Sequence, residues 1–186
     1  AGACGRAPKN LSRDLLRIMT RNSRMPAPYW ADIPCCNPET GCLRELVAIP
    51  FLPVHELMAS VVASVGTALT ELTVLEAGSG LARMFANSCF KQAHFEDGKV
   101  IPLGMHADGV PYSKNDTLEM FTWNFAAEPT AERYLFCGLA KKLFCKCGCK
   151  GRCTYDAILE IFVWCMLCLY TGSYPTSRHD NTPWLP

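Results

Sequence analysis

The stretch TLEMFTWNF, residues 117–125, decides the fold class of this chain. Its residues alternate: Phe121, Trp123 and Phe125 fall on one side of an extended chain, while Met120 and Thr122 fall on the other. A period of two with many aromatic residues is typical of a β-strand that has one face in a core. The sequence therefore predicts a central strand here.

Two further extended runs flank this stretch, at residues 100–110 and 132–139. The upstream run is separated from it by a turn signal near residues 113–116, and the downstream run follows Pro129. Short connections between consecutive strands favour neighbouring, antiparallel pairing. We expect a three-stranded antiparallel meander.

Helical patterns lie on both sides of the predicted meander. Apolar residues recur at helical spacing over residues 57–75 and again over residues 81–89, and Gly78-Ser79-Gly80 separates the two, which predicts a helical hairpin. Residues 157–170 are the most apolar run and should end before Gly172. A membrane span needs about 20 apolar residues, so we expect a buried C-terminal helix and no span.

These patterns predict an α+β fold in one domain: a three-stranded antiparallel meander packed against an N-terminal helical hairpin and a C-terminal buried helix. Residues 1–53 are expected to form a short amphipathic helix over residues 11–21 and a proline-rich strap without regular structure, because six prolines lie between residues 25 and 53. Residues 54–176 would be the core. Residues 177–186 would be an unstructured tail, and the chain is expected to be part of a longer protein.

Composition and charge restrict the function only in part. The chain has 186 residues, of which 49% are hydrophobic and 19% charged, and its net charge is +1. That balance is typical of a folded domain and gives no long-range field for nucleic acid or an anionic membrane. Five basic residues form a local run that either contacts phosphate groups or lies in a solvated turn: Lys141, Lys142, Lys146, Lys150 and Arg152.

Twelve cysteines include a dense cluster at Cys145, Cys147, Cys149 and Cys153. Thiolates bind Zn²⁺ as a tetrahedron, and glycines within the run would let a short loop turn its sulfurs inward. The spacing is not the usual pair of CxxC knuckles, so a structural zinc site, free thiols and disulfides all remain open. The scattered cysteines and the polar start of the chain favour an intracellular, reducing compartment.

A second candidate site is His106-Ala107-Asp108-Gly109, near the end of the first predicted strand. Mg²⁺ takes oxygen ligands, and a two-metal phosphoryl-transfer site needs two or three carboxylates on rigid elements. The alternative is an Asp-Gly turn or a hydrogen bond at a strand end. Other carboxylates that could converge on Asp108 are Asp116, Glu119, Asp156, Glu160 and Asp180.

Three stretches in order are similar to a large family of predicted proteins from dinoflagellate-type algal genomes: MPAPYWADIP at residues 25–34, residues 103–111 with HADGVP, and RHDNTPW at residues 178–184. The resemblance covers most of the chain from about residue 14 and implies no activity. The strand order also resembles the first half of the ribonuclease H-like fold of transposases and integrases, which would make Asp108 the first metal-binding carboxylate.

From these observations we expect a non-catalytic interaction or scaffold module within a larger protein or assembly, with one or more protein partners and a possible structural Zn²⁺. The alternative is a truncated ribonuclease H-like domain that processes nucleic acid, with Asp108 on a central strand and Mg²⁺ as its cofactor. This chain alone is not expected to be an enzyme.

Overall fold

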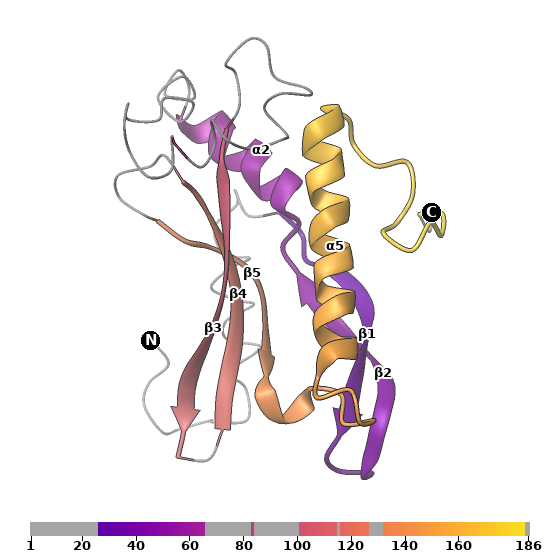
Figure 1. Ribbon diagram of the computed structural model, residues 1–186. Coiled ribbons are helices and arrows are strands. Elements are labelled where there is room, and N and C mark those ends of the chain that lie inside the picture. The colour runs from indigo at the N-terminus through magenta and orange to yellow at the C-terminus, as the bar shows by residue number, and fades with distance from the viewer. Residues whose placement is uncertain (1–25, 66–82, 84–100, 115, 127–131, 185–186) are drawn as a thin grey trace.

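Within the described residues, two antiparallel sheets and two α-helices form an α+β fold (Figure 1). The computed structural model describes residues 26–65, 83, 101–114, 116–126 and 132–184. In chain order the elements are β1 (Tyr29–Asn37), β2 (Cys42–Phe51), α2 (Val54–Val65), β3 (Leu103–Ser113), β4 (Asp116–Phe125), β5 (Tyr134–Ala140), the 3-10 helix η3 (Lys141–Leu143) and α5 (Arg152–Thr171).

The stretch at residues 117–125 lies in β4, the middle strand of a sheet with the order β3-β4-β5. Phe121 pairs with Ala107 on β3 and with Cys137 on β5, both antiparallel. The aromatic face of β4 is its buried face, because Phe121, Trp123 and Phe125 are all almost inaccessible to solvent. The α+β class is therefore confirmed.

The proline-rich segment is where the sequence-based prediction of no regular structure is wrong. β1 and β2 pair antiparallel over this segment, with Tyr29 opposite Phe51 and Cys35 opposite Glu45. Proline lacks an N–H and fits a strand only at an edge. A two-stranded sheet consists of edges alone, so Pro34 and Pro50 are tolerated within it.

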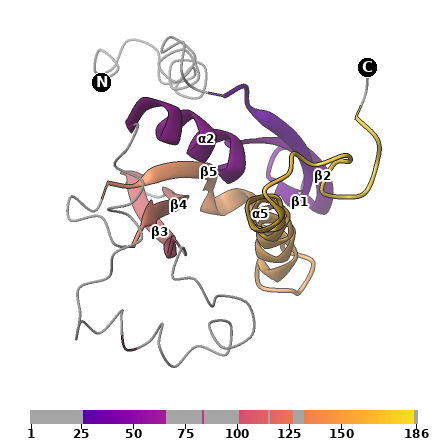
Figure 2. The ribbon, with the colours of Figure 1, turned by 90° about the horizontal axis from the view of Figure 1, so that it is seen from above.

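One hydrophobic core joins the two sheets and both helices. The residue that follows β2 is hydrogen-bonded to β5: the Leu52 N–H donates to the Phe136 carbonyl at 2.8 Å. The rings of Phe51 and Phe136 lie 5.2 Å apart across the same junction. Seen from above, α5 stands beside the β1–β2 hairpin, with β3, β4 and β5 on its other side (Figure 2).

α5 is only half buried, which corrects the prediction of a buried helix. Its inner face carries the buried residues Thr154, Ile158, Ile161, Cys165 and Cys168. Its outer face exposes large apolar side chains, including Leu159, Val163 and Leu167. With 20 residues and a mean hydropathy of 1.5, α5 is long and apolar enough to cross a membrane, so the absence of a span stays a prediction.

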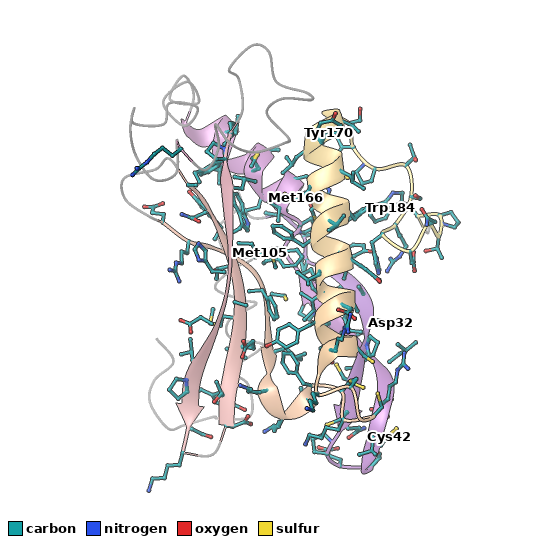
Figure 3. The ribbon with its side chains drawn as sticks, in the orientation of Figure 1. Asp32, Cys42, Met105, Met166, Tyr170 and Trp184 are labelled. Carbon is teal, nitrogen blue, oxygen red and sulfur yellow. The ribbon has the colours of Figure 1, made fainter. Side chains whose placement is uncertain are left out.

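The C-terminal residues up to 184 are folded back onto the protein, so the prediction of an unstructured tail is also wrong for these residues. Ser177 and Pro183 form a β-bridge that closes a turn, and Asp180 accepts hydrogen bonds from the backbone and hydroxyl of Thr182. Trp184 lies on the side of α5 that faces away from the three-stranded sheet (Figure 3).

Two predicted helical segments lie outside the described residues. These are the amphipathic helix at residues 11–21 and the second arm of the helical hairpin at residues 81–89, of which only residue 83 is described. α2 covers the beginning of the first arm, so the hairpin is matched only in this part.

Candidate metal centre

A tightly wound loop between η3 and α5 carries the four clustered cysteines. Three of its residues have a left-handed backbone: Gly148 with φ +95°, Lys150 with φ +54° and Gly151 with φ +85°. The Gly151 N–H donates to the Cys145 carbonyl at 3.1 Å, and the Arg152 N–H donates to the Cys149 carbonyl at 3.1 Å. Left-handed turns reverse the chain within a few residues, which glycine allows at low steric cost.

The loop brings four sulfur atoms together. The Sγ atoms of Cys145, Cys147, Cys149 and Cys153 all lie within 4.8 Å of one another, and those of Cys147 and Cys153 are 3.8 Å apart. A tetrahedral Zn²⁺ site with Zn–S bonds of about 2.3 Å places neighbouring sulfurs about 3.8 Å apart. The cluster therefore has the donor set for a metal ion and needs a contraction of at most about 1 Å to reach that geometry.

The four thiols differ in environment. Cys145 is buried, and this burial raises the pKa of its thiol to about 12. The backbone N–H of Cys153 can donate to the Cys149 thiolate, which lowers the pKa of Cys149 to about 6. Hydrogen bonds to Cys149 and Cys147 raise the pKa of Cys153. One thiolate therefore disfavours the ionisation of the neighbouring thiols. A bound cation would remove this repulsion between negative charges.

Backbone hydrogen bonds attach this loop to the β1–β2 hairpin and to α5. The Lys146 N–H donates to the Leu43 carbonyl of β2 at 2.9 Å. Thr154, fully buried in the first turn of α5, accepts from the Cys145 N–H at 2.9 Å and donates to the Pro34 carbonyl of β1 at 2.6 Å. The sulfur cluster consequently sits where three elements meet, at the turn end of the hairpin near Cys42 (Figure 3).

Asp108 is not where the ribonuclease H-like interpretation places it. It lies exposed on β3, an edge strand in the order β3-β4-β5, and not on the central strand. It pairs with Met120, on the sheet face opposite the buried Glu119, whose carboxylate accepts from the Tyr155 hydroxyl at 3.1 Å. Among the described residues, the cysteine cluster is the only group of three or more His, Cys, Asp or Glu side chains close enough to share a metal.

Two of the other predicted carboxylates form separate ion pairs. Asp116 pairs with Lys142 at 2.6 Å, and this contact lowers the pKa of Asp116. Asp156 pairs with Arg152 at 3.4 Å along α5. Two members of the basic run are thus engaged with carboxylates, and the run does not present all its charges to a phosphate.

An aromatic cluster lies next to the tail, and the sequence alone does not predict that its members meet. Tyr29 of β1 packs on Trp164 of α5 at 5.2 Å between ring centroids, and its hydroxyl lies 2.5 Å from Nδ1 of His179. Trp184 approaches both rings, at 6.0 Å from Tyr29 and 6.2 Å from Trp164. Two stretches noted in the sequence supply its members: MPAPYWADIP at residues 25–34 contains Tyr29, and RHDNTPW at residues 178–184 contains His179 and Trp184.

Between this tail and the outer face of α5 lies an open groove of about 580 Å³. Its lining is apolar along the helix and acidic at one end: Leu159, Val163, Trp164 and Leu167, with Asp156, Glu160, His179 and Asn181.

A search of protein-family models, of curated proteins and of solved structures finds no match to this chain.

Proposed function

We propose that the chain is a non-catalytic interaction module in which a structural Zn²⁺ on Cys145, Cys147, Cys149 and Cys153 fixes the start of α5 against the β1–β2 hairpin. The observation that carries the proposal is the convergence of four sulfur atoms within 4.8 Å of one another. Four thiolates close the coordination shell and leave no open position for a substrate or a reactive water, as in structural zinc sites.

The interaction role is supported by the surface of α5. Its outer face carries Leu159, Val163 and Leu167, which are 42%, 54% and 57% exposed and follow one another at four-residue spacing. A contiguous apolar stripe of this kind on a folded domain indicates a surface for a partner. The metal centre would set the position of this helix, and therefore the geometry of the surface.

The test is the metal content of the purified, reduced protein, measured by elemental mass spectrometry. We expect about one zinc per chain in the wild type, and less than about a tenth of this in a Cys147→Ser/Cys149→Ser variant, because two oxygen-for-sulfur replacements remove half of the ligands. Cys42→Ser is the matched control, since Cys42 is a partly accessible thiol of β2 outside the four-sulfur group, and it should retain the zinc.

The same samples report the structural role of the metal. A zinc-selective chelator should lower the melting temperature of the wild type and of Cys42→Ser, but not that of the double variant. Binding to the folded state alone stabilises it by about 2.7 kcal/mol when free zinc is a hundred times the Kd. A wild-type protein without zinc, or one with iron or copper in its place, would contradict the proposal.

A further inference from the structure

The groove between α5 and the folded tail is a surface feature that the metal centre does not explain. Six residues of α5 line one side of it, from Asp156 to Leu167. The tail runs beside the helix and supplies the opposite wall through His179 and Asn181 (Figure 1). Along the helix axis the α5 side extends over about 16 Å, at a rise of about 1.5 Å per residue.

The apolar part of the groove is a ridge of a shape that a second helix fits. Leu159, Val163 and Leu167 are exposed and follow one another at four-residue spacing. Side chains four residues apart form a ridge along a helix, and such a ridge packs into the groove between the ridges of another helix. The spacing therefore favours a helical occupant, and the length of the ridge corresponds to about three turns.

The charged side chains that line the groove are acidic. Asp156 and Glu160 lie at the end nearest the start of α5, and the described lining contains no lysine or arginine. Asp156 has Arg152 as its ion-pair partner at 3.4 Å, whereas Glu160 has no ion-pair partner among the described residues. On the opposite wall, burial lowers the pKa of His179 and so disfavours a positive charge there. The groove is therefore complementary to a cationic partner.

We propose that this groove binds a basic amphipathic helix of a partner protein. The partner's apolar residues, at positions i, i+4 and i+7, pack on the ridge of Leu159, Val163 and Leu167, and a lysine or arginine of the partner lies beside Glu160. An amphipathic helix in an apolar groove is a common mode of peptide recognition. The inference rests on the proposed function, because it gives the partner class of the same α5 surface.

Two other occupants fit the charge of the groove less well. A second copy bound through the same surface presents the same residues, and these include no lysine or arginine to pair with Glu160. The surface of an anionic bilayer attracts basic segments and repels the carboxylates of Asp156 and Glu160. A basic helix satisfies the apolar ridge and the acidic end together.

The test is a selection on the full, reduced chain with a random library of displayed peptides about 14 residues long, which corresponds to about four turns of helix. We expect the enriched peptides to carry apolar residues at helical spacing and a net positive charge. The tightest binder is then synthesised with a fluorophore. Its Kd for the wild type and for each variant is measured by fluorescence anisotropy at low ionic strength, where charge contacts are strongest.

Two pairs of matched variants make the test specific to the groove. Val163→Asp should raise the Kd at least about tenfold, because it removes apolar contact and places a carboxylate against the partner's apolar face. Val110→Asp makes the same change at an exposed valine of β3 outside the groove and should leave the Kd within about twofold. Glu160→Lys should raise the Kd at least about fivefold, since an attraction becomes a repulsion. Glu39→Lys, in the exposed turn between β1 and β2, should change it by less than about twofold.

Several results would overturn the proposal. These are the enrichment of no peptide, the enrichment of acidic peptides or of peptides without an apolar face, and equal effects of Glu160→Lys and Glu39→Lys. Light scattering that shows a wild-type dimer and a Val163→Asp monomer would identify a second copy as the occupant. Binding to phosphatidylcholine–phosphatidylserine vesicles that Val163→Asp abolishes would identify a lipid surface.

Zinc content, measured on the same samples, separates this inference from the proposed metal centre. A chain without zinc that still selects basic amphipathic helices would contradict the metal centre and leave the inference standing. A chain with zinc that selects no such helix would contradict the partner class and leave the metal centre standing.

Discussion

Thr154 is the residue through which the cysteine loop, the β1–β2 hairpin and α5 are joined. Its hydroxyl accepts from one backbone N–H and donates to one backbone carbonyl, and the residue is fully buried. The hydrogen bond from the Cys145 N–H is buried, so this group has no water as a substitute partner, and the hydrogen bond to the Pro34 carbonyl is partly buried. The contribution of this hydroxyl to stability should therefore exceed that of an ordinary surface hydrogen bond.

We predict that Thr154→Val lowers the free energy of unfolding by at least about 2 kcal/mol. Valine keeps the shape but leaves the Cys145 N–H and the Pro34 carbonyl unpaired, at roughly 1–3 kcal/mol for each group. Thr154→Ser retains the hydroxyl and should lose only about 1 kcal/mol for the buried methyl group. Urea denaturation followed by circular dichroism measures both, and equal losses in the two variants would contradict this role.

At the residue scale, the sequence already indicated which atoms could bind a metal. Four thiols in nine residues with glycines between them left a zinc loop, free thiols and disulfides open, and the structure brings the four sulfurs within 4.8 Å of one another. The sequence did not indicate Thr154, because a threonine near a helix start is expected to cap that helix. Its actual partners, Cys145 and Pro34, are nine and 120 residues away along the chain.

At the element scale, α5 shows how burial divides a largely apolar helix into a buried face and an exposed face. Ile158 and Leu159 are neighbours of the same size, yet Ile158 is fully buried and Leu159 is 42% exposed. The inner face packs against both sheets, and the outer face forms one wall of the groove. Composition alone could not separate them, since both faces are rich in aliphatic and aromatic residues.

We predict that Ile158→Ala lowers the free energy of unfolding by about 2–5 kcal/mol, because it removes buried methylene groups and leaves a cavity. Leu159→Ala should lower it by less than about 1 kcal/mol, because the side chain keeps much of its contact with water and alanine is a strong helix former. Thermal and urea denaturation of the two variants test this. A larger loss in Leu159→Ala would mean that the outer face is covered far more completely than the groove suggests.

The same comparison of elements explains the error in the proline-rich segment. Six prolines in residues 25–53 argue against a central strand or a helix, and neither occurs there. They do not argue against a two-stranded hairpin, in which the missing N–H can point outward. The segment also has the alternation of buried and accessible residues that is typical of a strand, because every second side chain points into the core: Tyr29, Ala31, Ile33 and Cys35.

At the scale of the whole molecule, two histidines, His55 and His179, lie beside Trp164 in the region where α2, α5 and the tail meet. His55 is buried beside this ring at 5.0 Å between centroids, and neither of its ring nitrogens has a hydrogen-bond partner in the described part of the chain. Burial lowers the pKa of His55, and burial likewise lowers the pKa of His179. The folded state therefore disfavours the protonation of both side chains.

We predict that stability falls as the pH is lowered from 7.5 to 5.5. The unfolded chain binds protons at its histidines near the ordinary pKa of 6.5, while the folded chain resists protonation, so the unfolded state takes up more protons and gains in population. The lowered carboxylate pKa values of Asp116 and Asp180 affect stability only at lower pH, because their ordinary pKa is 3.8.

His55→Phe is the informative variant for this dependence. It should be at least as stable as the wild type at pH 7.5, because it replaces unpaired buried nitrogens with an apolar ring of similar shape, and its stability should fall less towards pH 5.5. Any release of metal by acid is common to both proteins and cancels in the difference between them. Parallel curves for the two proteins, from urea titrations at each pH, would show that His55 does not contribute.

The sequence by itself determined the α+β class, the three-stranded sheet around residues 117–125, the end of α5 before Gly172 and the four candidate thiols. Each of these features follows from the periodicity or spacing of residues within a window of ten to twenty residues. Only the tertiary structure decided that the proline-rich segment pairs as a hairpin, that the tail folds back onto Tyr29 and Trp164, that one face of α5 stays exposed, and that Asp108 lies on an edge strand. These features depend on contacts between residues far apart in the chain, and local pattern carries no information about which distant surface will cover a given side chain.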